Sequence, residues 1–288
     1  VKFQTFRAES LASESASKAD YQQTVPGKNQ RDILRPLELS EEDHERLLLH
    51  CVSQEVEFLS TGFDQASVDF LLRLGIKRVK VPSGEITNLP LLRHVGGRKL
   101  PILLSTGMSN LGEIEAAVGV LESAGTVRED ITVLHCTTVY PAPVEEVNLR
   151  AMESIKRSLD VAVGYSDHTL GGQIAVAAAA LGAAVIEKHI TLDKTLPGPD
   201  HAASMEPEEF STMVKAIRDV EVAMGDGIKK PSKHERLNAS LVRKSIVAAK
   251  PIQEGEHFSE ENITTKRPGT GVSPMMWDDF IGRKASQT

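Results

Sequence analysis

The chain has 288 residues, of which 40% are hydrophobic and 25% are charged, and its formal net charge is -7. The length suits a barrel of roughly 250 residues with a small appendage, and the composition is that of a soluble globular protein. The acidic balance argues against a general nucleic-acid binder, and no apolar stretch is long enough to span a membrane. Two cysteines cannot form a disulfide framework, so we expect a reduced, cytoplasmic protein.

Short apolar runs rich in β-formers alternate with amphipathic helical patterns over most of the chain. Seven runs are predicted strands: 1–6, 56–63, 78–82, 101–106, 131–136, 161–165 and 185–190. This alternation predicts an α/β fold of parallel βα units, and we expect a (β/α)8 TIM barrel whose first βα unit is missing from the sequence. A doubly wound open sheet is the alternative, but no GxGxxG turn follows any of the strands.

Four helices are predicted between the strands. A start resembling a capping box at 40–43 opens the first, and apolar residues at helical spacing mark 110–124, 173–181 and 206–224. A long polar loop is expected from about residue 8 to residue 38. Loops of that length in a compact domain are usually functional.

The texture of the sequence changes after Gly225. We expect a barrel domain over 1–228, a linker over 229–240 and a small, partial β-rich domain over 241–288. Residues 245–249 form its clearest predicted strand, and residues 266–271 form a predicted loop.

Polar side chains follow almost every predicted strand, at the carboxyl end where a parallel barrel carries its active site. They are Lys2, Gln4, Thr61, Lys80, Ser83, Glu85, Ser105, Thr138, Tyr140, Ser166, His168, Glu187 and His189. A single Ser or Thr there is commonly a helix cap. The whole ring, with two lysines inside apolar strands, instead predicts an anion site.

His168 and His189 end neighbouring predicted strands, which suits a divalent metal with open positions. Asp167 is a candidate to orient His168. Glu85 and Glu187 are candidate acid–base groups, and Asp200 lies in a Pro/Gly-rich loop that can reach the mouth of the barrel.

The same segments resemble the N-acetylneuraminate synthase family, which includes legionaminate and pseudaminate synthases. The resemblance is carried in chain order by 1–6, 58–63, 80–85, 104–108, 134–141, 164–169, 187–191 and 197–201. The tail, with 266–271 as its clearest part, is similar to the antifreeze-like (SAF) domain of that family.

The resemblance implies an enzyme that condenses phosphoenolpyruvate with an N-acyl amino sugar and water, releasing a nonulosonic acid and phosphate. The acceptor would be N-acetylmannosamine or 2,4-diacetamido-2,4,6-trideoxymannose, and a divalent Mn²⁺ or Mg²⁺ would assist. The family also implies a homodimer in which the small domain covers the barrel of the partner subunit.

Roles follow by position from the resemblance. His168 and His189 would bind the metal. Glu85, Asp200 and Tyr140 would be catalytic. The substrate-binding residues would be Lys2, Gln4, Thr61, Lys80, Ser83, Ser105, Thr138, Ser166 and, across the dimer, Arg267 on the acyl group of the sugar. The sequence departs from the family in two places. Thr138 stands where some members have Asn. The first βα unit, which supplies a catalytic glutamate in the family, is missing from the sequence.

Other readings stay open. They are a synthase of another 3-deoxy sugar acid, a Schiff-base aldolase with Lys80 or Lys188 as nucleophile, and an inactive sugar-phosphate binder. The segment 18–22 is closer to neuraminate and legionaminate synthases than to pseudaminate synthases.

Overall fold

The computed structural model describes residues 1–18 and 26–288 and divides the chain into two compact units, Val1–Met224 and Gly225–Thr288. Most of the segment 18–22, expected to bear on the choice of sugar, lies outside the described residues.

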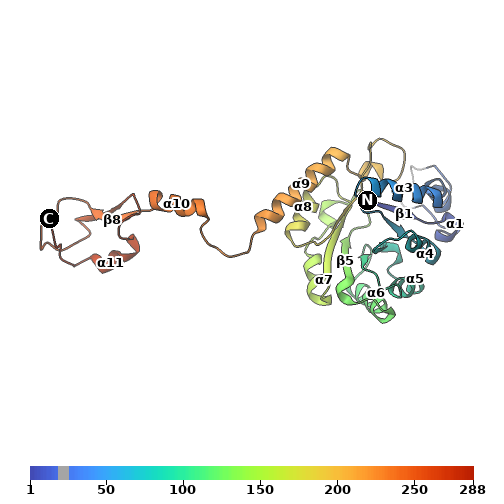
Figure 1. The fold of residues 1–288 in the computed structure, drawn as a ribbon, viewed down its shortest axis with the longest axis horizontal. Coiled ribbons are helices and arrows are strands. Elements are labelled where there is room, and N and C mark those ends of the chain that lie inside the picture. Colours follow the sequence, from blue (N-terminus) through green and yellow to red (C-terminus); the bar gives the residue numbers. More distant parts are fainter. Residues whose placement is uncertain (19–25) are drawn as a thin grey trace. The chain divides into compact units, whose positions relative to one another are not determined.

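The first unit contains a parallel sheet in which each strand pairs with the next one along the chain. Its strands are β1 (Lys2–Thr5), β2 (Leu59–Gly62), β3 (Val79–Val81), β4 (Ile102–Ser105), β5 (Ile131–Cys136), β6 (Ala162–Asp167) and β7 (Ile186–Lys188). All seven predicted strands are therefore confirmed, and the sheet matches a (β/α)8-like barrel (Figure 1).

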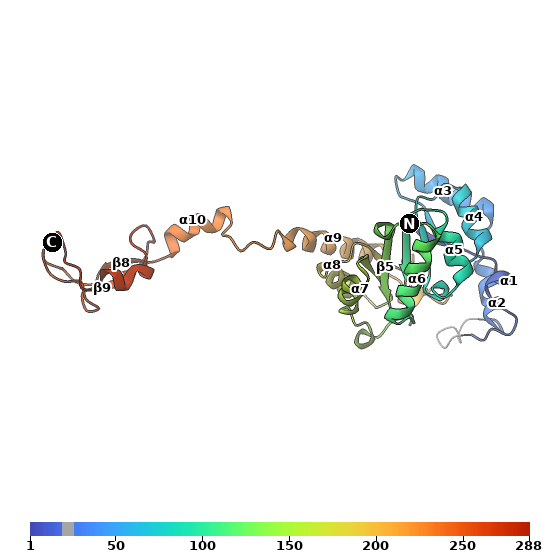
Figure 2. The ribbon, with the colours of Figure 1, turned by 90° about the horizontal axis from the view of Figure 1, so that it is seen from below.

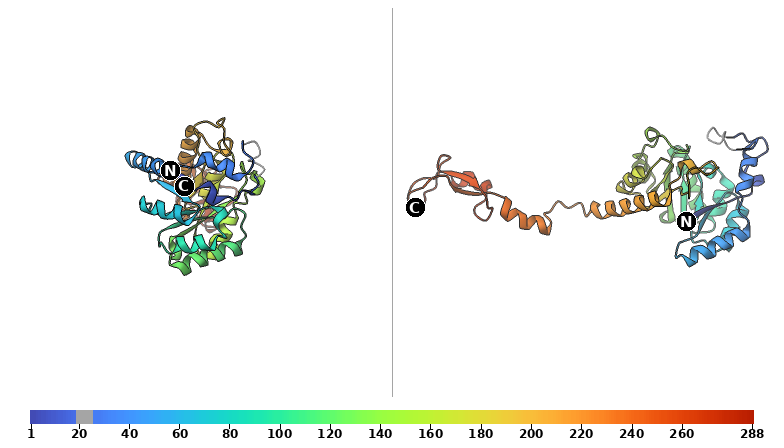
Figure 3. Two further views of the ribbon diagram at one scale, coloured as in Figure 1. Left: turned by 90° about the vertical axis from the view of Figure 1, so that its right-hand side faces the viewer. Right: turned by 90° about the horizontal axis from the view of Figure 1, so that it is seen from above.

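Helices follow these strands along the chain and cover the outer face of the sheet (Figures 1 and 2). They are α3 (Glu41–Ser53), α4 (Gln65–Arg73), α5 (Leu89–Gly96), α6 (Leu111–Ala124), α7 (Ala151–Leu159), α8 (Gln173–Ala180) and α9 (Pro207–Met224). Capping boxes begin two of them: Ser40 exchanges hydrogen bonds with Asp43, and Asn110 with Glu113. The left-hand view in Figure 3 shows the blue, cyan and green helices of this unit arranged around the strands.

Alternation along the strands separates the core from the site. Val79 and Val81 of β3 join the apolar cluster beneath the helices, whereas Lys80 between them faces inward. The same holds for β6, where Val163 and Tyr165 are in the apolar cluster and Ser166 faces the inside of the sheet. The polar residues of the predicted ring are thus carried on a rigid, buried scaffold.

The segment between β1 and α3 is more regular than the polar loop we expected. It contains α1 (Ala8–Leu11) and α2 (Gln30–Leu34). Asn29 caps α2 by accepting a hydrogen bond from the Asp32 amide at 3.0 Å. Such short helices are held by local caps and lack the long apolar periodicity that a sequence reading depends on.

The second unit is small and contains an antiparallel pair, β8 (Ser245–Ala248) and β9 (Ile263–Lys266), with α11 (Trp277–Phe280). A small apolar cluster holds it together, formed by Ile252, Ile263 and Ala285 with Ile246, Phe258 and Trp277. Residues 233–240, expected as part of a linker, form the first part of α10 (Lys233–Val242), which Ser232 caps. In the described part of the chain, no helix is long and apolar enough to cross a membrane.

Candidate active site

A buried lysine on β3, Lys80, is the centre of a charged cluster inside the sheet. We call this cluster, formed by Lys2, Lys80, Ser105, Ser166 and Glu187, the floor of the site. Lys80 is only 2% exposed, and its Nζ donates to Ser105 Oγ at 2.5 Å at the end of β4. Glu187 Oε2 on β7 lies 3.7 Å from the same Nζ and 2.8 Å from Lys2 Nζ on β1. Ser166 on β6 donates to the other oxygen of Glu187 at 2.8 Å. Three of the predicted substrate-binding residues, Lys2, Lys80 and Ser166, therefore meet at one carboxylate, and Ser105 contacts Lys80.

The charges on this floor are strongly coupled. Burial lowers the pKa of Lys80 to about 8, although Glu187 opposes that effect. Burial raises the pKa of Glu187, but the nearby Lys80 and Lys2 outweigh it and bring that pKa to about 2. Glu187 is thus ionised at neutral pH and acts as the counter-ion of two lysines, which corrects its interpretation as an acid–base group. The floor keeps one net positive charge for an anion when Lys80 is protonated.

A pair of histidines lies above this floor. His168 follows β6 and His189 follows β7, and their ring centroids are 5.2 Å apart. The ring of Tyr140 lies 4.1 Å from His168 and 5.7 Å from His189. Asp200 Oδ2 lies 3.5 Å from His189 Nδ1. The structure therefore brings together the two predicted metal ligands and two of the three predicted catalytic residues.

Burial favours the neutral form of both histidines, and the surroundings of His168 leave one of its lone pairs available. The Thr137 carbonyl accepts a hydrogen bond from His168 Nδ1 at 2.7 Å, so Nδ1 carries the proton and Nε2 is left with a free lone pair. Burial lowers the pKa of His168 to about 4. Burial, assisted by the Lys2 charge, does the same for His189. Neutral imidazoles with a backbone partner on the far nitrogen are suitable metal ligands.

The donor set fits an open metal site and not a closed one. Within residues 1–18 and 26–288, no group of three or more His, Cys, Asp or Glu side chains is arranged to hold a metal ion. His168 and His189 would supply two ligands, and water or substrate would supply the others.

A second group of hydroxyls surrounds Gly107, directly after β4. The Gly107 amide donates to Ser83 Oγ at 2.9 Å. A Cβ at residue 107 would lie 1.8 Å from Thr138 Oγ1, so only glycine fits. Thr138 Oγ1 is itself buried and has no hydrogen-bond partner among the residues that the structure describes. A buried, unsatisfied hydroxyl beside a second hydroxyl is a feature expected of a ligand site.

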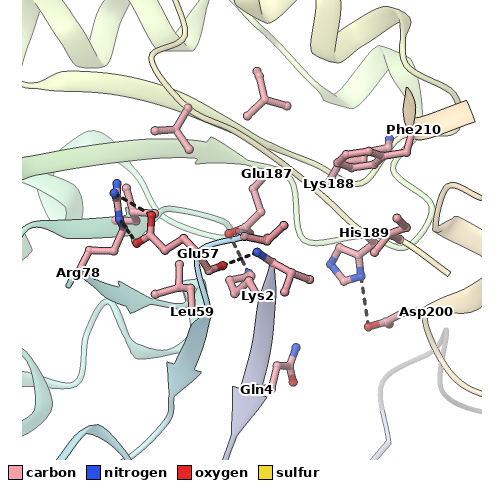
Figure 4. A pocket seen from close by; sticks show the side chains of 16 residues that line it. Lys2, Gln4, Glu57, Leu59, Arg78, Glu187, Lys188, His189, Asp200 and Phe210 are labelled. Atoms are coloured by element: carbon pink, nitrogen blue, oxygen red, sulfur yellow. Dashed lines mark hydrogen bonds and ion pairs between the residues drawn. The ribbon is translucent and has the colours of Figure 1, made fainter. Parts of the chain in front are cut away.

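A cavity of about 630 Å³ opens between β1 and β7 and reaches this chemistry (Figure 4). Lys2, Gln4, Glu187, His189 and Asp200 line it. The volume lies within the range typical of small-molecule sites. Thr61, which pairs in register with Gln4 and with Lys80, is buried on β2 beside it.

Two of the predicted site residues, Glu85 and Arg267, do not belong to the residue groups described above. Glu85 ends the 3₁₀ turn Ser83–Glu85 and accepts a hydrogen bond from Asn88 at 2.6 Å. Arg267 is exposed in the second unit, just after β9. Its contact with the sugar in a partner subunit stays a prediction.

Two polar residues point away from the site. Asp167 was expected to orient His168, and Lys188 was a possible nucleophile. Strand alternation instead places both on the outer face, where they form an ion pair of 2.8 Å. Figure 4 shows Lys188 directed away from Lys2 and Glu187. The Thr137 carbonyl orients His168, and sequence reasoning missed it because a main-chain oxygen carries no residue-type signal.

Comparison with known proteins places this arrangement in a family. A family model described as the NeuB family matches residues 1–229. The chain belongs to the NeuB family. A model of the SAF domain matches residues 243–288, as the tail predicted.

Relatives of this NeuB-family chain match it along its whole length. It is 53% identical to the N,N'-diacetyllegionaminic acid synthase of Campylobacter jejuni, over 100% of this chain and 86% of the relative. It is 46% identical to the synthase of that name from Legionella pneumophila, over 99% and 82%. Among solved structures, N-acetylneuraminic acid synthetase from Leptospira borgpetersenii is 29% identical, with a TM-score of 0.73 over 82% of this chain and 78% of that one.

Proposed function

We propose that this protein condenses phosphoenolpyruvate with an N-acyl amino sugar and water, giving a nonulosonic acid and phosphate. The observation that carries the proposal is the buried Lys80, held with Lys2 and Ser105 beneath the pair His168 and His189. A site with cationic and hydroxyl donors below neutral imidazoles suits an anionic donor and a polarised acceptor. Membership of the NeuB family supports the same reaction class.

The relatives support one of the two candidate acceptors. Two of them, at 53% and 46% identity, are N,N'-diacetyllegionaminic acid synthases. Removing the three carbons of pyruvate from such a product leaves a six-carbon sugar with two acetamido groups. We therefore take 2,4-diacetamido-2,4,6-trideoxymannose as the acceptor, with N-acetylmannosamine as the alternative.

Phosphoenolpyruvate is proposed to bind with its phosphate and carboxylate toward Lys2, Lys80 and the hydroxyls of Ser83, Ser105 and Thr138. The partnerless hydroxyl of Thr138 gains a hydrogen bond when this anion binds. Glu187 holds both lysines in place without neutralising them completely. The anion is thereby oriented with C3 toward the mouth.

In the proposed reaction a carbon–carbon bond forms and the bond from phosphoenolpyruvate to its phosphate breaks. C3 of phosphoenolpyruvate bonds to the aldehyde carbon, whose oxygen takes up a proton and becomes a hydroxyl. Water adds at C2, the bond between C2 and the phosphate oxygen breaks, and C2 becomes the keto carbon of the product. The two protons of the water pass to the aldehyde oxygen and to the departing phosphate. A divalent Mn²⁺ or Mg²⁺ on His168 and His189 would supply a Lewis acid for the aldehyde oxygen. Burial raises the pKa of Asp200, which suits it to hold and pass the proton at that oxygen.

The contacts to the sugar, the homodimer and the cellular setting are part of the same proposal. Gln4 lines the cavity and is proposed to contact the sugar, as is Arg267 from a partner subunit in a homodimer. A cytoplasmic setting is proposed because Cys51 and Cys136 are buried, unbridged thiols.

The test is phosphate release from phosphoenolpyruvate, measured with Mn²⁺ or EDTA and with each candidate sugar. Metal-dependent release that needs the diacetamido sugar is the expected result. In ¹⁸O-water the label should enter the sugar acid and not the phosphate, because the C2–O bond is the one that breaks. Lys80→Met should abolish release, whereas Lys233→Met, on the exposed start of α10, should not change it. A folded protein that releases no phosphate with any of these sugars would contradict the proposal.

One observation favours a second candidate. The lowered pKa of Lys80 is also what a Schiff-base aldolase requires of its nucleophile. Borohydride added with pyruvate and sugar should trap an adduct on Lys80 in an aldolase and none in the synthase.

A further inference from the structure

A fully buried ion pair lies on the outer face of the sheet, behind the two histidines. Asp167 Oδ2 and Lys188 Nζ are 2.8 Å apart, and their side chains are 0% and 1% exposed. The other carboxylate oxygen accepts from Thr169 N at 2.9 Å and from Thr169 Oγ1 at 2.8 Å. Lys188 Nζ also donates to the Thr169 carbonyl. We call these three residues the outer staple.

Stability alone does not account for the outer staple. Its neighbours on the same face of β6 and β7, Val163, Tyr165 and Ile186, belong to or pack on the apolar core. Replacing a buried ion pair by apolar residues of similar volume is often neutral or stabilising, because both charges were desolvated. A charged pair at this place therefore points to a geometric role.

The register supplies that role. Asp167 pairs with Lys188 across β6 and β7, and the residue that follows each strand is one of the histidines. Successive side chains point to opposite faces of a strand. A pair locked on the outer face therefore sets where His168 and His189 emerge on the inner face, at their ring separation of 5.2 Å. A slip of one residue would turn both imidazoles away from the site.

The outer staple also brackets His168 along the chain. Asp167 precedes it and Thr169 follows it, and both are 1% exposed or less. The Thr137 carbonyl, 2.7 Å from His168 Nδ1, then fixes the rotation of the ring. The backbone of His168 is thus held from both sides, independently of the groups that hold its side chain.

We infer that Asp167 and Lys188 are positioning residues, whose ion pair holds His168 and His189 at the separation that a divalent cation needs. The inference rests on the proposed function, because that function places the cation on these two histidines. Neither residue touches substrate or cation, so their effect is carried by the strands.

The test compares three variants of the full chain: Asp167→Asn, Lys188→Met and the double variant. The probe is Mn²⁺ alone, with the free ion counted by its electron paramagnetic resonance signal, and thermal unfolding is measured in parallel. Each single variant leaves a group without its partner and should unfold more easily. The double variant removes both charges and should recover most of that stability.

The double variant decides the matter. If the pair positions the histidines, its affinity for Mn²⁺ stays lower than that of the wild type by about 10- to 100-fold, the range seen when outer-shell partners of a metal are lost. If the pair serves stability only, stability and Mn²⁺ affinity return together, and the inference is overturned. Glu122→Gln, which removes the 2.6 Å, partly exposed ion pair with Arg128 on the helical layer, is the control and should leave Mn²⁺ affinity unchanged.

Mn²⁺ binding by the wild-type protein and by the double variant separates the positioning role from the metal in the proposed function. A wild-type protein that binds no Mn²⁺ contradicts the metal in the proposed function, and the positioning role falls with it. A wild-type protein that binds Mn²⁺, with a double variant that binds it equally well, contradicts the positioning role alone.

Discussion

The Nζ atom of Lys2 lies 2.8 Å from Oε2 of Glu187, so an ion pair links the first strand of the parallel sheet to the last. Glu187 also faces Lys80 at 3.7 Å and accepts from Ser166. One carboxylate thus organises the floor of the site through residues from four strands.

We expect Glu187→Gln to lower the free energy of unfolding by roughly 3 kcal/mol, because it leaves the buried Lys80 and the partly buried Lys2 without their counter-ion. Denaturant unfolding measures this. The control is Glu57→Gln, whose ion pair with Arg78 is more than 40% exposed on both sides. An exposed pair contributes about 1 kcal/mol at most. Equal losses in the two variants would contradict the central role of Glu187.

The same residue predicts how stability depends on pH. The pKa of Glu187 is about 2 in the folded protein and 4.5 ordinarily, so the unfolded chain binds the proton first. The contribution of Glu187 is therefore complete above pH 4.5 and is lost as the pH falls toward 2. Its full size is about 3 kcal/mol. The difference in melting temperature between wild type and Glu187→Gln should shrink over this window, and a constant difference would contradict the prediction.

Lys80 predicts the opposite dependence for ligand binding. Its pKa is about 8, so its charge is lost as the pH rises through that value, and affinity for phosphoenolpyruvate should fall above it. Ser105→Ala removes a hydroxyl that accepts from the protonated Nζ at 2.5 Å. That change should move the fall to lower pH. Calorimetric titration at a series of pH values measures both effects, and Ser53→Ala on α3 should change neither.

The strands could be predicted from the sequence because each is a short apolar run between helical patterns, as in 101–106. The polar ring could be predicted because Lys80, Ser166 and His189 occupy the alternate positions whose side chains face the inside of the sheet. The position of the Asp167 side chain could not be predicted from adjacency to His168, since neighbouring residues face opposite sides. The role of Glu187 depended on distances to two other strands, which no local pattern contains.

The partnerless hydroxyl of Thr138 gives a prediction in which stability and binding move in opposite directions. Thr138→Val keeps the shape and removes a buried hydroxyl that has no partner, so the variant should be at least as stable as the wild type. Its KM for phosphoenolpyruvate should nevertheless rise roughly tenfold, the effect of a lost hydrogen bond of about 1.4 kcal/mol. Thermal unfolding and initial rates measure the two effects.

A hydroxyl with a partner is the control for Thr138. Thr126→Val removes the bond to the Gly96 carbonyl at 3.1 Å, so it should cost about 1 kcal/mol of stability and leave KM unchanged. An unchanged KM in Thr138→Val would remove this hydroxyl from the proposed anion site.

Gly107 gives a prediction about the room that the proposed anion site leaves for a side chain at this position. In Gly107→Ala the new Cβ would lie 1.8 Å from Thr138 Oγ1 and 2.9 Å from Ser83 Oγ, so both hydroxyls must move. We expect affinity for phosphoenolpyruvate to fall by about 10-fold or more, with a loss of stability of about 1–3 kcal/mol from overpacking. Gly119→Ala on α6 is the matched control, because no described atom outside its chain neighbours and the surrounding helix backbone lies within 4 Å of the new Cβ. That variant should bind normally and gain up to about 1 kcal/mol from helix propensity. If Gly107→Ala loses stability but binds phosphoenolpyruvate as the wild type does, the hydroxyls around residue 107 serve packing and not the anion.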